Sequence, residues 1–148
     1  MPKHSEIRPV RYTAVQMYSL VADVERYPEF LPWCSAARIR SVEKQGDAEV
    51  MAVDLVISFK VFRERFGSTV TLRAGQRRID TKYLDGPFKY LQSTWAFSDT
   101  DTGSDVDFSV DFEFRNVMLQ KVIGVVFDQA MRRIVRAFED RAAALFDQ

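Results

Sequence analysis

Few side chains in this sequence have the type and spacing that catalysis requires. The one histidine, His4, stands where we expect a mobile terminus, so it is a poor candidate for a base or a metal ligand. The one cysteine, Cys34, follows Trp33, and an apolar setting would raise its thiol pKa and reduce its nucleophilicity. The paired motifs of zinc sites, phosphate loops and nucleophile elbows are absent. We therefore expect no catalytic residue, no metal site and no cofactor.

Carboxylates are the remaining candidates for acid–base chemistry. Asp107, Asp111 and Glu113 alternate with apolar residues, which places them on the solvent-facing side of a strand. Asp54 and Glu64 could be turned inward by a β-bulge. The sequence thus favours a protein that is not an enzyme.

Composition limits the partners. The chain has 148 residues with 21 basic and 21 acidic side chains, so no net field attracts DNA or an anionic membrane. One cysteine is typical of a reducing compartment, and the start of the chain lacks the apolar run of a secretory signal. The run from Val122 to Phe127 is too short to span a bilayer. We expect one domain, residues 1–148, in the cytoplasm, with peripheral contact at the inner membrane left open.

The elements near the N-terminus are a strand and a helix. Residues 5–10 are predicted to form an edge strand, because Pro9 cannot donate a hydrogen bond to a neighbour. Thr13 and Gln16 have the spacing of a capping box, and helical spacing continues from residue 14 to about residue 26. Pro28 is expected to end that helix.

The middle of the chain alternates between apolar and polar residues. Seven strands are predicted in an antiparallel sheet, and Gly67 is expected to mark a bulge. Two of these strands place a row of apolar residues on one face. In the first strand these apolar residues are Val53, Leu55, Ile57, Phe59 and Val61. In the second strand they are Val106, Phe108, Val110, Phe112 and Phe114.

A long helix over residues 117–146 is predicted to cover the apolar face, with Asn116 as N-cap. Gly124 lies inside it, and a kink or a close approach would explain this glycine. The predicted apolar stripe consists of Val122, Val126, Ala130, Ile134, Phe138, Ala142 and Leu145, widened by Phe127, Met131 and Val135. The order strand, helix, strands, long helix indicates an α+β fold.

Arginines form two groups. One is predicted on the outer face of the sheet (Arg63, Arg65, Arg73, Arg77 and Arg78), and the other on the outer side of the long helix (Arg132, Arg133 and Arg136). Either group is a solvated surface or a contact for acidic lipid headgroups or ribosomal RNA. Aromatic residues are not interleaved with these arginines, so a base-stacking surface is not expected.

The surplus of aromatic residues, including twelve Phe, suggests a core or an elongated cavity lined with rings. A tightly packed aromatic core is the alternative. An apolar cavity of this kind would suit a ligand with little hydrogen-bonding capacity.

The stretch VADVERYPEFLPWC resembles the signature of the coenzyme Q-binding protein family within the START-like, or helix-grip, superfamily. The resemblance continues through SFKVFRERFGSTVTL, GPFKYLQSTWAF, VDFSVDFEF and AMRRIVRAFEDRAAALF. It implies a β-α-β6-α fold, with a curved antiparallel sheet around the C-terminal helix and a hydrophobic tunnel between them. It also implies non-catalytic binding and transport of ubiquinone or a prenylated precursor in support of respiratory electron transport. The lack of a targeting extension before Met1 fits a bacterial form.

Two alternatives accompany this resemblance. A bacterial branch of the superfamily is described as a toxin that blocks association of ribosomal subunits, and the label polyketide cyclase/dehydrase leaves a cyclase-like enzyme open. For the main function, the residues expected to line the tunnel are Tyr27, Phe30, Leu31, Trp33, Leu55, Ile57, Phe59, Trp95, Phe97, Phe108, Val110, Phe112, Val126, Phe127, Ala130 and Ile134. The first four of these would wall its mouth.

Overall fold

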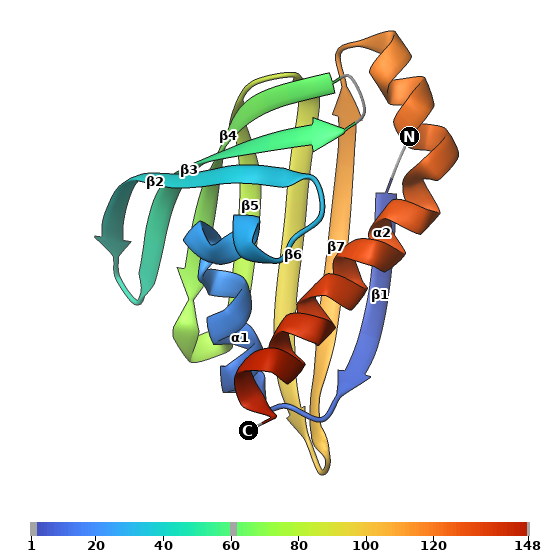
Figure 1. Ribbon diagram of the computed structural model, residues 1–148. Helices are drawn as coiled ribbons and strands as arrows, with labels where there is room; N and C mark the ends of the chain where they lie inside the picture. Colours follow the sequence, from blue (N-terminus) through green and yellow to red (C-terminus); the bar gives the residue numbers. More distant parts are fainter. Residues whose placement is uncertain (1–2, 60–61, 148) are drawn as a thin grey trace.

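The computed structural model describes residues 3–59 and 62–147, so Val61 lies outside the described residues. The elements, in chain order, are β1 Lys3–Val10, α1 Ala14–Ala22, η1 Val24–Glu29, β2 Cys34–Gln45, β3 Ala48–Phe59, β4 Phe62–Arg73, η2 Ala74–Gln76, β5 Arg78–Asp85, β6 Phe88–Thr100, β7 Gly103–Phe114 and α2 Val117–Phe146 (Figure 1). Here η denotes a 3-10 helix. The predicted order of one strand, one helix, further strands and a long helix is confirmed.

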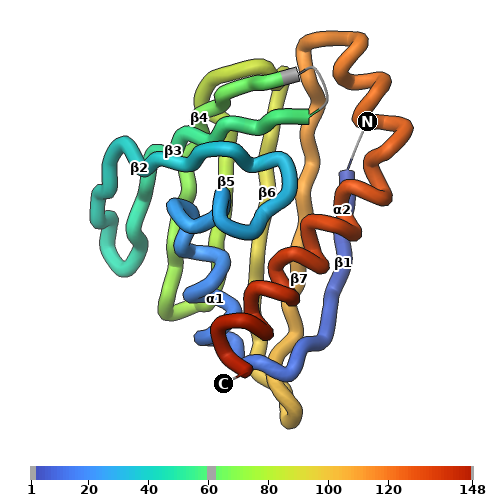
Figure 2. The backbone as a smooth tube through the Cα atoms, in the orientation of Figure 1, coloured from blue at the N-terminus to red at the C-terminus, as the bar shows by residue number. Residues whose placement is uncertain are grey.

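The described strands form one antiparallel sheet in the order β1-β7-β6-β5-β4-β3-β2, with the predicted seven strands. β1 is an edge strand, as Pro9 indicated. The sheet is strongly curved, and β2, β3 and β4 cross in front of β5, β6 and β7 (Figure 1). α1 and α2 lie on the same concave side, and the C-terminal half of α2 runs beside α1 (Figure 2).

Inward-facing rings fill the space between the sheet and the helices. On β7, Phe108, Phe112 and Phe114 are buried, whereas Asp107 on the other face is exposed. The Trp95 and Phe108 rings stack with centroids 4.2 Å apart. The alternation predicted for this strand is confirmed, and it directs one aromatic layer toward α2.

The first helix is shorter than predicted. Its capping box is present, because the Gln16 amide donates to Thr13 Oγ1 at 3.1 Å and the Thr13 amide donates to Gln16 Oε1 at 2.9 Å. The helix ends at Ala22, however, and Pro28 lies inside η1. The hydrogen bonds that close η1 are donated by Arg26 and Phe30 to Asp23 and Tyr27, so they do not require an amide hydrogen at Pro28. The prediction that Pro28 ends the helix was therefore wrong.

The bulge predicted at Gly67 is confirmed by a register shift between Gly67 and Ser68 in the pairing of β4 with β5. A Cβ at Gly67 would lie 2.6 Å from Arg40 Nη2 and 2.8 Å from Asp85 Oδ1. The missing side chain thus leaves room for an ion-pair network on the outer face of the sheet.

α2 is capped as predicted, since the Leu119 amide donates to Asn116 Oδ1 at 3.0 Å. The centre of the predicted stripe is buried, but Val122 and Val126 are only half-buried and Leu145 is 43% exposed. Residues four apart precess by about 40° at each step, so a row of such residues leaves the buried face at both ends. Leu119, which lies outside that row, is buried instead.

A close approach does not explain Gly124. A Cβ at this position would meet no atom within 4 Å, and Gly124 itself is exposed. The axis of α2 does change direction between its first turns and the remainder of the helix (Figure 1).

Candidate functional site

An apolar cavity of about 170 Å³ lies between the concave face of the sheet and α2. The described side chains that line it carry no charge. They are Trp33, Ile57, Phe59, Phe66, Phe88, Leu91, Val110, Phe112, Phe114, Ile123, Phe127, Ala130, Met131 and Ile134. The chemistry of this lining fits an apolar guest.

The size of the cavity limits that guest. An engineered apolar cavity of about 150 Å³ holds benzene, whereas sites for drug-sized ligands measure about 300–1,000 Å³. The space in this structure therefore accommodates one ring or a short isoprenoid stretch. A longer guest would require α2 to move away from the sheet.

The cavity brings together part of the set predicted to line the tunnel. The predicted residues that line it are Trp33, Ile57, Phe59, Val110, Phe112, Phe127, Ala130 and Ile134. Trp95 and Phe108 lie instead beside a separate void of about 20 Å³ near Val135.

The other predicted tunnel residues lie away from the cavity. Phe97 is buried against Tyr18, with ring centroids 6.1 Å apart, and Leu55 packs against the core. Val126 is half-buried on the flank of α2, because a row of residues spaced four apart drifts off the buried face of the helix. Leu31 packs on the core near η1 without lining the cavity.

Six lining residues were missing from the predicted set. Phe114 shares the strand parity of Phe108, Val110 and Phe112, which were included, so counting parity along β7 would have found it. Phe66 lies opposite Leu55 in the pairing of β3 with β4, and no β4 residue was in the predicted set. Ile123 and Met131 flank Phe127 at a spacing of four on α2. Phe88 and Leu91 lie across a register shift in β6, which hides their common face from a parity count.

The aromatic segment around Pro28 fastens η1 to α2. The rings of Tyr27 and Phe30 meet Phe138 edge-on at 5.6 and 5.3 Å between centroids. The Tyr27 hydroxyl donates to the Val21 carbonyl, and burial raises the pKa of this hydroxyl. Of the four residues predicted to wall the mouth, only Trp33 reaches the cavity.

The two inward-turned carboxylate candidates have different positions. Glu64 lines a small void of about 30 Å³ next to Phe88 and Ile123. Asp54 lies on the outer face, where Arg65 and Arg40 approach it at 2.6 and 3.2 Å. Among the described residues that line the cavity and this void, Glu64 is the only ionisable one.

His4 and Cys34 also have defined positions. His4 lies in β1, not in a mobile terminus, and its Nε2 is 2.7 Å from Glu6 Oε1. Cys34 is half-buried, and burial raises the pKa of its thiol, as the sequence suggested. Within residues 3–59 and 62–147 no group of His, Cys, Asp and Glu side chains has the arrangement of a metal site.

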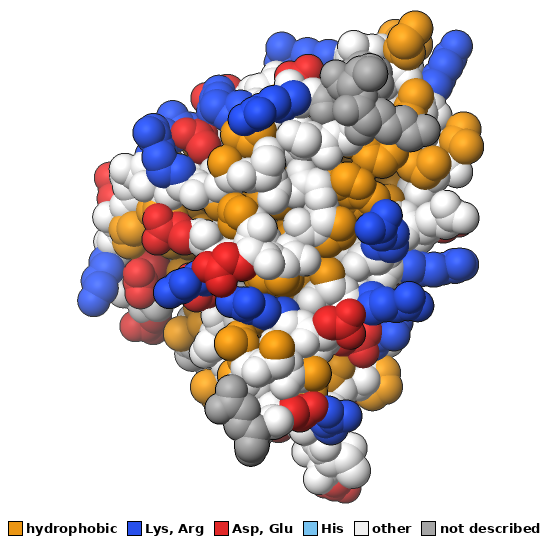
Figure 3. Space-filling model, in the orientation of Figure 1, with side chains coloured by type: hydrophobic (Ala, Val, Ile, Leu, Met, Phe, Trp, Pro, Cys, Tyr) orange, Lys and Arg blue, Asp and Glu red, His pale blue; other side chains and the backbone are white. Residues whose placement is uncertain are grey.

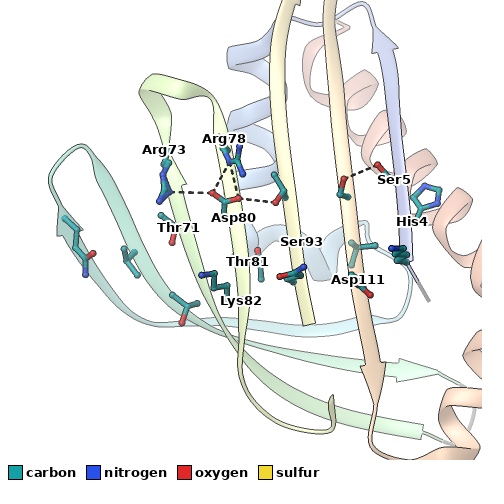
Figure 4. Close-up of a pocket in the computed structure, with 18 residues that line it drawn as sticks. His4, Ser5, Thr71, Arg73, Arg78, Asp80, Thr81, Lys82, Ser93 and Asp111 are labelled. Carbon is teal, nitrogen blue, oxygen red and sulfur yellow. Dashed lines mark hydrogen bonds and ion pairs between the residues drawn. The ribbon is translucent and has the colours of Figure 1, made fainter. Parts of the chain in front are cut away.

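The outer face of the sheet holds a broad polar depression of about 1000 Å³ (Figure 4). The two arginines of this depression form ion pairs with the same acid. Arg73 Nη1 lies 3.5 Å from Asp80 Oδ2, and Arg78 Nε lies 3.1 Å from the same oxygen. Arg65 likewise pairs with Asp54 and Asp85, and Arg77 with Asp99. Four of the five predicted arginines of the outer face are therefore paired with an acid, and Arg63 is exposed without an ion pair among the described residues.

The arginines of α2 differ from those of the sheet. Arg132, Arg133 and Arg136 are exposed on the outer side of the helix, as predicted, and none has an ion-pair partner among the described residues. Figure 3 shows basic side chains gathered along the middle of α2. The Arg133 guanidinium lies 5.1 Å from the Trp33 ring centroid, so the expectation that no aromatic residue accompanies these arginines was wrong.

In the part of the chain that the structure describes, no helix combines the length and the apolar character needed to cross a membrane.

Several curated relatives match nearly the whole chain, among them a toxin and a coenzyme Q-binding protein. The ribosome association toxin RatA of Rickettsia prowazekii is 41% identical over 143 residues, which cover 95% of this chain and 94% of the toxin. The mitochondrial coenzyme Q-binding protein COQ10 homolog B of Xenopus laevis is 30% identical over 149 residues, which cover 97% of this chain and 59% of that protein. A profile of the family described as polyketide cyclase / dehydrase and lipid transport matches residues 10–139.

Solved structures show the same fold. An 18 kDa protein of Caulobacter crescentus has a TM-score of 0.84 and 30% identity, and the match covers 100% of both chains. A START superfamily protein of Mycobacterium smegmatis has a TM-score of 0.78 and 19% identity, covering 97% of this chain and 98% of that one. The Zhui aromatase/cyclase of Streptomyces has a TM-score of 0.75 and 17% identity, covering 95% and 92%. The last two show the fold alone, which is the START-like helix-grip fold.

Proposed function

The chain belongs to the polyketide cyclase / dehydrase and lipid transport family, and we propose that within it this protein associates with the ribosome and does so without catalysis. The observation that carries this proposal is the 41% identity to a ribosome association toxin over 95% of this chain and 94% of that protein. The coenzyme Q-binding relative is less similar, and this chain spans only 59% of it. These similarities support ribosome association over quinone transport as the proposed main function.

The charge distribution supports this proposal. The chain has no net charge, so attraction to the polyanionic ribosome must come from a local surface. The α2 arginines supply such a surface, because they are exposed and have no acidic partner among the described residues. Arg65, Arg73, Arg77 and Arg78 of the predicted outer-face group are less available, since their charges are offset by Asp54, Asp80, Asp85 and Asp99.

Sucrose-gradient sedimentation tests the proposal. The purified protein is added to ribosomes from its host at low salt, and its position is followed through the gradient. We expect it to move with ribosomal particles, and we expect the free-subunit peaks to grow when the protein is overproduced. Protein that stays at the top of the gradient, together with an unchanged subunit profile, would overturn the proposal.

The cavity favours a second function, the binding of an apolar guest such as a prenylated quinone or a lipid. Burying one five-carbon isoprenoid unit contributes about 4 kcal/mol at about 0.8 kcal/mol per carbon, which corresponds to roughly millimolar affinity. The present cavity of about 170 Å³ thus supports only weak binding. Useful affinity would require α2 to open further. Met118 and Val125, exposed by 68% and 87% near the start of α2, are the residues that would face a membrane supplying the guest.

Mass spectrometry of an organic extract tests this second function. Protein purified from its native host is expected to release a prenylated quinone or a similar lipid in roughly stoichiometric amount. Added quinone is expected to quench the fluorescence of Trp33, which lines the cavity. An empty extract and unchanged fluorescence would contradict the second function and leave ribosome association standing.

A further inference from the structure

A groove of about 570 Å³ runs between the loop after η1 and the second half of α2. Phe30 and Pro32 form one wall, and Arg133 and Arg136 form the other. Part of its lining comes from the small residue Ala137, which allows a flat group to approach the helix closely. This groove lies on the outer side of α2, and its lining shares no residue with that of the cavity.

Two of the arginines that line this groove each lie over an aromatic ring. The Arg133 guanidinium lies over the Trp33 ring at 5.1 Å from its centroid, and the Arg141 guanidinium lies over the Phe30 ring at 5.2 Å. A guanidinium that is stacked on a ring leaves its other planar face available to a further flat group. Planar stacking surfaces beside cations are what a nucleobase and its phosphate require.

The arginines of the groove differ in whether they have an acidic partner. Arg141 donates to Glu29 Oε1 at 2.9 Å, and its Nε is buried without a hydrogen-bond acceptor. Arg133 and Arg136 have no acidic partner among the residues that the structure describes, and Asp140 is the one acid in the lining. The groove therefore has excess positive charge that a phosphate could neutralise.

Trp33 contacts the end of β3 through both its ring and its backbone, and its ring meets the Phe59 ring edge-on at 5.6 Å between centroids. Its backbone has φ 65°, a left-handed conformation that bulky residues rarely adopt. The Ser58 amide donates to the Trp33 carbonyl at 2.8 Å, which ties this backbone to the end of β3. Backbone conformations of this kind persist where surrounding contacts impose them. Together with the Phe59 contact, this backbone places the Trp33 ring beneath Arg133.

We propose that the groove between η1 and α2 binds an unpaired segment of ribosomal RNA, with a base stacked on the Arg133–Trp33 pair and a backbone phosphate on Arg136. The inference rests on the proposed ribosome association and names the surface and the component recognised. An unpaired segment is the expected occupant, because bases in an RNA duplex cannot reach a stacking surface.

Fluorescence anisotropy with a short labelled oligoadenylate measures this binding directly. Arg133→Lys keeps the charge but removes the planar group, and we expect binding to weaken roughly five- to hundredfold through loss of base stacking. Arg136→Glu is expected to lower the slope of log affinity against log salt by about 0.7, the value for one lost phosphate contact on a single strand. Lys82→Glu is the matched control, because Lys82 is an exposed cation in the outer depression and has no ion pair among the described residues.

Sedimentation with ribosomes separates this inference from the function on which it rests. If the wild type sediments with ribosomes and Arg133→Lys and Arg136→Glu do so more weakly than Lys82→Glu, the groove is supported. If all variants sediment like the wild type, or if only Lys82→Glu is impaired, the groove is wrong and ribosome association stands. If the wild type does not sediment with ribosomes, the proposed function itself fails. The two groove variants are also compared with the wild type for binding to phosphatidylglycerol vesicles. If Arg133→Lys and Arg136→Glu lose binding to these vesicles but bind oligoadenylate as the wild type does, the inference is overturned.

Discussion

Glu29 connects η1 to the long helix through two arginines. Arg26 donates to one of its carboxylate oxygens at 3.0 Å, and Arg141 donates to the other at 2.9 Å. These hydrogen bonds hold the pKa of Glu29 below its ordinary value, and the hydrogen bond from Arg26 has the larger effect. Because Arg141 also stacks on Phe30, the contact helps to fix the wall of the groove.

This contact predicts a pH-dependent contribution to stability. A lowered pKa in the folded state means that the ionised carboxylate stabilises folding above its ordinary pKa near 4.5. The contribution is lost as the pH falls through the lowered folded pKa. Glu29→Gln should therefore reduce the free energy of unfolding at pH 7, and the difference from the wild type should disappear in strong acid.

Urea denaturation over a series of pH values measures this difference. Glu25→Gln is the control, because Glu25 lies in the same 3-10 helix without an ion pair among the described side chains. A difference between Glu29→Gln and wild type that stays constant at every pH would contradict the assignment.

At the scale of elements, α2 has two faces with different partners. Its inner face contributes Phe127, Ala130 and Met131 to the cavity, and its outer face contributes Arg133 and Arg136 to the groove. The cavity lies in the space between the curved sheet and the helix. One helix thus separates an apolar site from a basic one.

Gly124 allows a test of whether a glycine inside α2 lowers the stability of the protein. A Cβ at this position meets nothing within 4 Å, and its φ is not left-handed. Gly124→Ala should therefore stabilise the protein by about 1 kcal/mol, because alanine loses less backbone entropy in a helix. Thermal and urea unfolding measure the change.

Gly75→Ala serves as its control, because a Cβ there also meets nothing but the residue lies in η2, outside the α-helices. A much smaller gain is expected for it. A loss of stability in Gly124→Ala would show that the helix needs the glycine, for instance for its change of direction.

At the scale of the whole molecule, the cavity and the groove lie on opposite sides of α2 and meet at Trp33, whose ring lines the cavity and lies under the Arg133 guanidinium. Ala130 lines the cavity, and Ala137 lines the groove. A larger side chain at either position should therefore obstruct one site and spare the other.

Ala130→Leu and Ala137→Leu form the matched pair that tests this separation. Ala130→Leu should reduce co-purifying lipid and quinone quenching of Trp33, with ribosome sedimentation unchanged, because three added carbons occupy the cavity. Ala137→Leu should weaken binding to ribosomes and oligoadenylate and leave lipid content unchanged. If each variant impaired both activities while remaining folded, the two sites would not be independent.

The sequence by itself determined the features that depend on neighbours along the chain. The capping box at Thr13, the N-cap at Asn116, the bulge at Gly67 and the alternation of β7 were all predictable. Each follows from hydrogen bonds or side-chain directions set within a few residues. The exceptions were also local in origin, since a 3-10 helix tolerates Pro28 and a row of residues at spacing four drifts off the buried face.

Only the tertiary structure decided which distant side chains meet. The contact of Trp33 with Arg133 joins segments a hundred residues apart, and no periodicity along the chain could indicate it. The cavity lining and the neutralisation of Arg73 and Arg78 by Asp80 likewise depend on how the sheet curves and how α2 crosses it. Sheet curvature and helix crossing arise from packing the whole core at once, so a local pattern in the sequence does not specify them.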